Sequence, residues 1–250
     1  MQNDNVALSV KNFSYTEVDE TSGNVTYHYI DDSKAPDRGS IHNPRLVYSA
    51  TTLENEILNE TASNNINTTN YRVLKDISYN EFEGHSGLYK VIYAGNFEGN
   101  GMDITGFASV FMDNRNNGGL FSQIGYAANK IGSVKNLSLA PKEIVFNNTN
   151  NVGVLAGTLK YGYIYDINVD SLENNLPSVS GLNFVGGIIG KAINDFEAKD
   201  IYSNTNVWAV YSPSNNETFI EGAGQDSAFS YAGGLIGFVG QGKVYNAHVK

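Results

Sequence analysis

Cysteine is absent from this chain of 250 residues, and positively charged residues are few. The absence of cysteine excludes a disulfide framework, a zinc site with thiolate ligands and a cysteine nucleophile. The 16 Lys and Arg residues are outnumbered by 26 Asp and Glu residues, which gives a net charge of −10. Affinity for nucleic acid depends on clustered positive charge, so we expect no nucleic-acid partner.

Long apolar runs are also missing from the sequence. No stretch of about 18 apolar residues occurs, so we expect no direct membrane insertion. The first residues, MQNDN, have neither the basic region nor the apolar segment of a secretion signal. If the protein is exported, this sequence is expected to be its mature form or an excised part of it.

Only 17% of the residues are charged, and only five are prolines, whereas 26 are glycines and 16 are tyrosines. Helical proteins are typically rich in Ala, Glu, Lys and Leu. A polar, weakly charged and aromatic-rich composition instead favours β structure with many turns. The hydrophobic fraction of 41% is sufficient for a folded core.

The N-terminal fifth of the chain predicts a β hairpin followed by a loop. Aromatic and β-branched residues alternate on both sides of the turn sequence TSGN at residues 21–24, which is typical of a hairpin. The polar stretch 31–44 predicts a loop. We therefore treat residues 1–50 as one region.

A second region, residues 51–250, begins with a predicted helix. Residues 51–54, TTLE, form a capping-box pattern, and Leu53 and Ile57 fall on one helical face. We expect a short helix over residues 51–60 that caps the structure following it.

An internal repeat is the strongest pattern in the sequence. A glycine-containing segment occurs four times, as GGLFS, GVLAG, GGIIG and GGLIG, starting at residues 118, 153, 186 and 233. Each is followed after 11 to 16 residues by a second segment, VKNLSL, IYDINV, AKDIYS or VYNAHV. Two motifs that recur in one order at this period are typical of stacked supersecondary units.

The repeat predicts strands rather than helices. Its apolar runs are too short and too rich in glycine for a helical repeat, and a propeller blade would need four strands in each unit. The fold class is therefore predicted as all-β, a parallel β-helix (β-solenoid) with an N-terminal β hairpin and a short capping helix. Successive coils would pair at the inter-strand spacing of about 4.8 Å.

Aligning the units predicts which residues stack in columns. Two inward columns are expected, Val134, Ile164, Ala198 and Val244, and Leu137, Ile167, Ile201 and Ala247. Between them lie Asn136, Asp166, Asp200 and Asn246, which we expect at coil corners in the left-handed conformation, with side chains that bond neighbouring coils. Glycines 118, 153, 186 and 233 are expected to allow a tight bend or a positive φ. Of Ile188 and Ile189, the alternation of a strand predicts that one faces inward.

These motifs resemble the GLUG-motif repeat, over about residues 45–250. The repeat occurs in large bacterial surface adhesins and in IgA-specific metallopeptidases. The resemblance implies a parallel β-helix and an extracellular or bacterial cell-surface location. The HExxH zinc motif of the metallopeptidases is absent, so no protease activity is implied.

No pattern of catalytic or metal-binding residues stands out. The four histidines are scattered without ligand-like spacing, and the adjacent acidic pairs at 19–20 and 31–32 precede the repeats. We expect no enzyme, no cofactor and no metal site. A β-helix enzyme that cleaves polysaccharides remains an alternative, since columns can bring distant residues together.

The aromatic residues predict a binding face. Tyr161, Tyr163 and Tyr165 alternate with small or inward residues and should leave one face of a strand, with Tyr165 in a column with Lys135, Lys199 and Tyr245. Aromatic rings beside hydrogen-bonding side chains suit a glycan or a host surface protein. Trp208 either contacts such a ligand or anchors the insertion that follows it. The alternative is that these side chains only cover a solvated β face.

Three functions are compatible with these patterns. The first is adhesin-type binding to a glycan or host protein, the second a structural spacer or stalk of a larger surface or pilus-associated protein, and the third the polysaccharide-cleaving enzyme. The sequence stops inside the repeat's second motif, so we expect it to be part of a longer chain or of an assembly.

Overall fold

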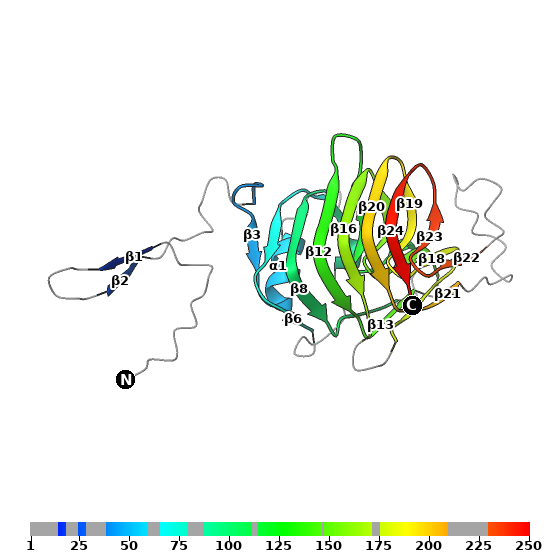
Figure 1. Ribbon diagram of the computed structural model, residues 1–250, viewed down its shortest axis with the longest axis horizontal. Helices are drawn as coiled ribbons and strands as arrows, with labels where there is room; N and C mark the ends of the chain where they lie inside the picture. Colours follow the sequence, from blue (N-terminus) through cyan, green and yellow to red (C-terminus); the bar gives the residue numbers. More distant parts are fainter. Residues whose placement is uncertain are drawn as a thin grey trace.

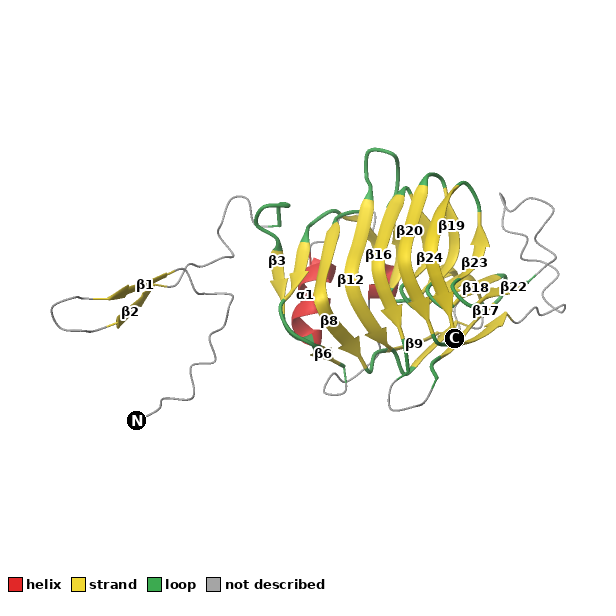
Figure 2. Ribbon diagram, viewed as in Figure 1, coloured by secondary structure: helices red, strands yellow, loops and turns green. Residues whose placement is uncertain are grey.

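The computed structural model describes residues 15–18, 25–28, 39–59, 66–79, 88–111, 115–146, 148–171, 176–209 and 230–250. Strands dominate these residues, and the sheets that contain the repeats are parallel throughout (Figure 2). The predicted all-β class is therefore confirmed.

The N-terminal strands β1 (Tyr15–Val18) and β2 (Val25–His28) form a separate antiparallel pair, with Val18 opposite Val25. This confirms the predicted hairpin strands, whereas the turn at 21–24 lies outside the described residues.

The largest sheet runs along one side of the molecule (Figure 1). Its order is β24-β20-β16-β12-β8-β5-β3, and β6 also pairs with β8. Its strands are β3 (Arg45–Val47), β5 (Tyr71–Val73), β6 (Ile77–Ser78), β8 (Asn96–Thr105), β12 (Gly132–Ala140), β16 (Gly162–Val169), β20 (Phe196–Ser203) and β24 (Gly242–Val249). Strand β3 joins this sheet although it lies in the segment that we assigned to the hairpin and loop.

Three smaller parallel sheets complete the repeats. One contains β4 (Ile66–Asn67), β7 (Ile92–Tyr93), β11 (Phe121–Ile124), β15 (Ala156–Lys160), β19 (Ile189–Ile193) and β23 (Ile236–Val239). The second contains β10 (Arg115–Gly118), β14 (Thr149–Gly153), β18 (Phe184–Gly186) and β22 (Tyr231–Gly233). The third contains β9 (Ala108–Phe111), β13 (Glu143–Phe146), β17 (Ser178–Gly181) and β21 (Asn206–Ala209).

Each repeat unit contributes one strand to each of the four sheets. The chain runs through β9, β10, β11 and β12, then through β13 to β16, β17 to β20 and β21 to β24, and each strand pairs with its equivalent in the next unit. The glycine-containing segments lie where one strand ends and the next begins, for example between β18 and β19. The second motifs form β12, β16, β20 and β24.

The predicted columns are confirmed by the strand register. Val134 is paired with Ile164, Ile164 with Ala198 and Ala198 with Val244, and the second column is paired in the same way. The first three members of each column are no more than 2% exposed, so these columns form one wall of the core. Burial of such apolar side chains is the main favourable contribution to folding.

The Asn and Asp positions between the columns have the predicted backbone conformation, but they do not lie at corners. Asn136, Asp166, Asp200 and Asn246 have φ between 52° and 54°, in the left-handed region. All four lie inside continuous strands. Two successive side chains therefore point outward at this point of each strand, which explains why the apolar residues on either side both face the core.

The corners lie instead at the glycine-containing segments. Glycines 118, 153, 186 and 233 are followed by a bend, as predicted, but none of them has a positive φ. At Gly153 a side chain would be excluded by close backbone contact, because a Cβ atom there would lie 2.5 Å from the oxygen of Ile188. Because the chain turns between Ile188 and Ile189, both are fully buried, and the prediction that only one faces inward is wrong.

Helix α1 (Ala50–Asn59) begins one residue earlier than predicted and has a different cap. The hydroxyl of Ser49 accepts a hydrogen bond from the backbone N–H of Thr52 at 3.1 Å, so Ser49, and not Thr51, is the N-cap. Leu53 and Ile57 are fully buried on one face, as predicted. Glu54, expected in a capping box, is 4% exposed and accepts a hydrogen bond from the hydroxyl of Tyr79 at 2.6 Å.

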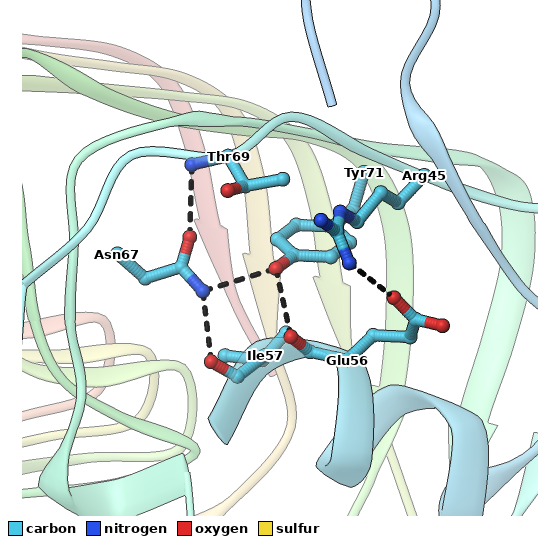
Figure 3. Close-up of polar contacts among 6 residues, drawn as sticks. All are labelled: Arg45, Glu56, Ile57, Asn67, Thr69 and Tyr71. Atoms are coloured by element: carbon cyan, nitrogen blue, oxygen red, sulfur yellow. Dashed lines mark hydrogen bonds and ion pairs between the residues drawn. The ribbon is translucent and has the colours of Figure 1, made fainter. Parts of the chain in front are cut away.

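The C-terminal carbonyl groups of α1 are bonded by side chains from the sheets (Figure 3). Asn67 Nδ2 donates to the oxygen of Ile57 at 2.9 Å, and the hydroxyl of Tyr71 donates to the oxygen of Glu56 at 3.1 Å. The last four carbonyls of a helix have no partner within the helix, and these two bonds satisfy two of them. An ion pair of 2.8 Å between Arg45 and Glu56 also joins α1 to β3.

Candidate functional site

The outer face of β16, β20 and β24 carries the predicted aromatic and basic column. Tyr165 is paired with Lys135 on one side and with Lys199 on the other, and Lys199 is paired with Tyr245. The three strands are neighbours in the largest sheet (Figure 1). Four of the predicted site residues, Tyr163, Tyr165, Lys199 and Tyr245, are therefore brought together.

Tyr161 does not belong to this face. It precedes β16 and has a φ of 50°, so the alternation that relates Tyr163 to Tyr165 does not extend to it. Lys160 Nζ lies 5.8 Å from the centre of its ring. The prediction that all three tyrosines leave one face of a strand is thus wrong for Tyr161, because the chain turns at that residue.

The rings of Tyr163 and Tyr165 are parallel, with 8° between their planes and 6.1 Å between their centres.

Trp208 is also separate from this face. It lies on β21, in the sheet of β9, β13 and β17, and its side chain is 61% exposed. Its proposed role as an anchor for the insertion involves residues 210–229, which lie outside the described part of the chain.

Glu197 is a central residue of the face that the sequence did not single out. It is paired with Tyr163 on β16, and its Oε1 accepts a hydrogen bond from the hydroxyl of Tyr165 at 3.1 Å. The hydroxyl of Tyr245, on β24, also interacts with this carboxylate and lowers its pKa. These contacts connect all three strands. The signal for Glu197 was its position two residues before Lys199 on the same strand face.

The hydrogen bonds around Glu197 shift three pKa values. The bond from Tyr245 lowers the pKa of Glu197 most, with a further contribution from Tyr165. Partial burial, together with the bond to Glu197, raises the pKa of Tyr165 to about 12. The pKa of Tyr245 is raised mainly by the same carboxylate. At neutral pH the face therefore presents an ionised Glu197 held between two neutral hydroxyls.

An open depression of about 670 Å³ lies beside this carboxylate. It is lined by Asn136, Tyr165, Asp166, Glu197, Lys199 and Asp200. Asp200 accepts a hydrogen bond from Asn246 Nδ2 at 2.8 Å and lies 3.6 Å from Lys199 Nζ. Asp166 is exposed at the same site. The depression thus combines an aromatic ring with carboxylate acceptors and one ammonium donor.

A second aromatic group, which the sequence analysis missed, lies on a different part of the surface. Phe184 stacks on Tyr231 with 5.6 Å between ring centres, and its ring centre is 5.0 Å from that of Phe238. Lys191 Nζ lies 5.0 Å from the Phe184 ring centre. Burial lowers the pKa of Lys191. These residues come from β18, β19, β22 and β23, and only the strand register could have placed them together.

No group of three or more His, Cys, Asp or Glu residues in the described part of the chain is arranged to hold a metal ion. No helix in the same residues is both long and apolar enough to span a membrane.

Comparison of the chain with protein-family models, with curated protein sequences and with solved structures gives no match. The resemblance to the GLUG-motif repeat stays a prediction, which rests on the residues quoted for it.

Proposed function

We propose that this chain is a non-catalytic binding module, built as a parallel β-solenoid of the GLUG-repeat type, whose outer face on β16, β20 and β24 binds a glycan. The solenoid is supported by the repeated order of strands and by parallel pairing between equivalent strands of successive units. The proposed location is extracellular or on a bacterial cell surface, in keeping with the resemblance to adhesin repeats.

The observation that carries the glycan proposal is the composition of the depression. A sugar ring is typically bound by stacking its apolar face on an aromatic ring while its hydroxyls bond polar side chains. Tyr165 offers the ring, and the carboxylates of Asp166, Glu197 and Asp200 offer acceptors. The parallel ring of Tyr163 extends the aromatic surface along the strand.

The hydrogen bonds within the site favour a preformed surface. Tyr165 is held by its hydrogen bond to Glu197, and Lys199 Nζ lies 3.6 Å from Asp200. Side chains that are already ordered lose less conformational entropy when a ligand binds. The strands beneath them are paired on both sides in the case of β16 and β20, which limits movement of the face.

The experiment is a glycan array probed with the full chain, followed by titration of the best ligand. We expect the double change Tyr163→Ala and Tyr165→Ala to weaken binding by about 1–3 kcal/mol while the circular dichroism spectrum is retained. Tyr126→Ala is the matched control, because Tyr126 is 43% exposed, has a lysine over its ring and lies outside the depression.

The outcome of Trp208→Ala distinguishes the two predicted surfaces. Loss of binding in Trp208→Ala, without loss of binding in the double tyrosine variant, would contradict the proposed face and place the ligand on the sheet of β21.

A polysaccharide panel assayed for product release tests the enzyme alternative, because three carboxylates line the depression. Released product would contradict the non-catalytic assignment.

The second candidate function is a structural spacer or stalk. Hydrogen-bonded ladders between repeat units favour it: Asn183 Nδ2 donates to Asn150 at 2.9 Å, and Asn151 Nδ2 donates to Asn117 at 2.8 Å. Such ladders stiffen a stack without any ligand. A chain that binds nothing on glycan arrays or on host proteins would support this role over adhesion. Membership of a longer chain or assembly belongs to both proposals.

A further inference from the structure

The dipeptide Asn-Gly occurs twice in the sequence, at residues 100–101 and 117–118. In such a pair the backbone nitrogen of the glycine can attack the side-chain amide carbon of the asparagine, because glycine has no side chain that obstructs ring closure. The reaction needs an accessible nitrogen and a backbone that can rotate. The two pairs differ in both respects.

Asn100 and Gly101 lie in a bulge of β8. The register between β8 and β12 shifts here, so that residues 99–101 face the single residue Asn136. On the other side of β8, β5 ends before this point and β6 begins after it. Among the described strands, the register therefore gives residues 99–101 no partner of their own. The extra residues of a bulge lie outside the regular ladder of hydrogen bonds.

Both residues of this pair are exposed and depart from regular strand geometry. Asn100 has a φ of 58° and Gly101 a φ of 73°. Apart from the chain neighbours of Gly101, no atom of the described residues lies within 4 Å of the position that a Cβ atom on this glycine would occupy. This open space admits water and leaves room for the backbone to rotate.

The second pair is held in place by its neighbours. Asn117 is paired with Asn151 on β14, and Asn151 Nδ2 donates a hydrogen bond to Asn117 Oδ1 at 2.8 Å. The hydroxyl of Thr158 donates to the same oxygen at 2.6 Å. Gly118 is buried, and a Cβ atom on it would lie 2.6 Å from the ring of Phe146. Neither water nor a rotated backbone has room at this pair.

We propose that Asn100 deamidates spontaneously in the folded chain, whereas Asn117 does not. The nitrogen of Gly101 forms a bond to Cγ of Asn100, the bond from Cγ to the side-chain nitrogen breaks, and ammonia leaves. A succinimide ring remains. Water then opens one of its two C–N bonds, which gives either aspartate or isoaspartate at position 100. The reaction consumes only water and needs no oxidant or cofactor.

The product carboxylate would lie beside Glu98, at one end of the outward column that contains Tyr165. Glu98 Oε1 accepts a hydrogen bond from the backbone N–H of Asn100 at 2.9 Å, and Oε2 lies 3.0 Å from Lys135 Nζ. Asn100→Asp carries the new charge from the start. Because a nearby like charge disfavours ionisation, carboxyl NMR should show a raised pKa of Glu98 in this variant. An unchanged pKa would exclude this effect on the face.

The test of the modification itself is incubation of the full chain at mildly alkaline pH, followed by tryptic digestion and mass spectrometry. Cleavage after Lys90, Arg115 and Lys130 places the two Asn-Gly pairs on separate peptides. We expect the peptide 91–115 to gain the mass difference between an amide and an acid, located at Asn100 by fragmentation. The peptide 116–130 should stay unchanged. Enzymatic methylation of the isoaspartyl carboxyl group identifies that product.

The unfolded chain is the matched control. In concentrated urea both pairs should react at similar rates, because the protection of Asn117 comes from the fold. Asn100→Gln should abolish the change in the peptide 91–115, since the longer side chain closes its ring far more slowly. An unmodified Asn100 in the folded chain, after a period in which the unfolded chain reacts, would overturn the proposal. Equal modification of Asn117 in the folded chain would also overturn it.

Discussion

The hydroxyl of Tyr165 donates a hydrogen bond to Glu197 across two neighbouring strands, at 3.1 Å. The two residues are not opposite each other: Glu197 is paired with Tyr163, and Tyr165 with Lys199. The bond is therefore a diagonal contact, which long side chains can make on one face of a sheet. It connects the aromatic pair on β16 to the charged residues on β20.

Replacing Tyr245 by Phe should raise the pKa of Glu197 toward its ordinary value, because the largest cause of its lowering is removed. Tyr165→Phe should have a smaller effect in the same direction. The measurement is carboxyl NMR of the chain during acid titration. Because the pKa of Glu197 is lower in the folded chain than in the unfolded chain, its ionised carboxylate stabilises the fold at pH values above the ordinary pKa. This stabilisation is lost as the pH falls through the folded value. An unchanged Glu197 titration in Tyr245→Phe would show that this hydroxyl does not bond the carboxylate.

Stability should also decrease at alkaline pH because of Tyr165. Its pKa is about 12 in the folded chain, against a reference value of 10.0. Between these values the unfolded chain releases the proton and the folded chain retains it, so unfolding becomes more favourable as the pH rises. Urea titrations at a series of pH values should show a shallower decline for Tyr165→Phe than for the unaltered chain. Equal declines in the two proteins would contradict the assigned pKa.

The left-handed position inside the strands can be tested at Asp166, which has a φ of 53° and is exposed. Glycine adopts this conformation without strain, whereas alanine is destabilised there by about 1 kcal/mol. We expect Asp166→Gly to be more stable than Asp166→Ala in denaturant titrations, which is the reverse of the usual order within a strand. If Asp166→Ala were the more stable variant, the positive φ would be excluded.

Both isoleucines at the β18–β19 corner should be intolerant of charge. Ile188→Asp and Ile189→Asp each place a carboxylate in a fully buried position and should cost several kcal/mol, roughly 3–5. Thermal unfolding followed by circular dichroism measures this loss, with Lys142→Asp on the exposed surface as the control. Destabilisation by only one of the two substitutions would support the simple alternation of inward and outward side chains at residues 188 and 189.

The end of α1 depends on Asn67, which is fully buried and donates to both the oxygen of Ile57 and the hydroxyl of Tyr71. Asn67→Ala leaves a buried carbonyl without this donor and should cost about 1–3 kcal/mol. The exposed Asn116, whose side-chain oxygen accepts a hydrogen bond of 3.4 Å from Asn150 on β14, provides the matched control as Asn116→Ala. Similar stabilities of these two variants in denaturant titrations would show that the cap contributes little.

The strand columns could be predicted because the repeat is encoded locally. The offset between the apolar residues of VKNLSL, IYDINV, AKDIYS and VYNAHV is the same in each unit, and parallel pairing places equal offsets side by side. The left-handed Asn and Asp positions could be predicted for the same reason, since few other residue types tolerate that conformation. The hairpin strands and the buried face of α1 also follow from short-range patterns.

The features that only the tertiary structure decided depend on where the chain turns and on which strands lie beside one another. Alternation alone cannot locate a bend, so Tyr161 was assigned to the strand that it precedes, and only one of Ile188 and Ile189 was expected in the core. The cap at Ser49 and the bonds from Asn67 and Tyr71 depend on the position of α1 against the sheets, which the capping-box pattern does not specify. Glu197 became part of the site through a diagonal contact between β16 and β20. Side-chain direction follows local periodicity only as long as the backbone stays regular, and the irregular positions are set by packing across the whole stack.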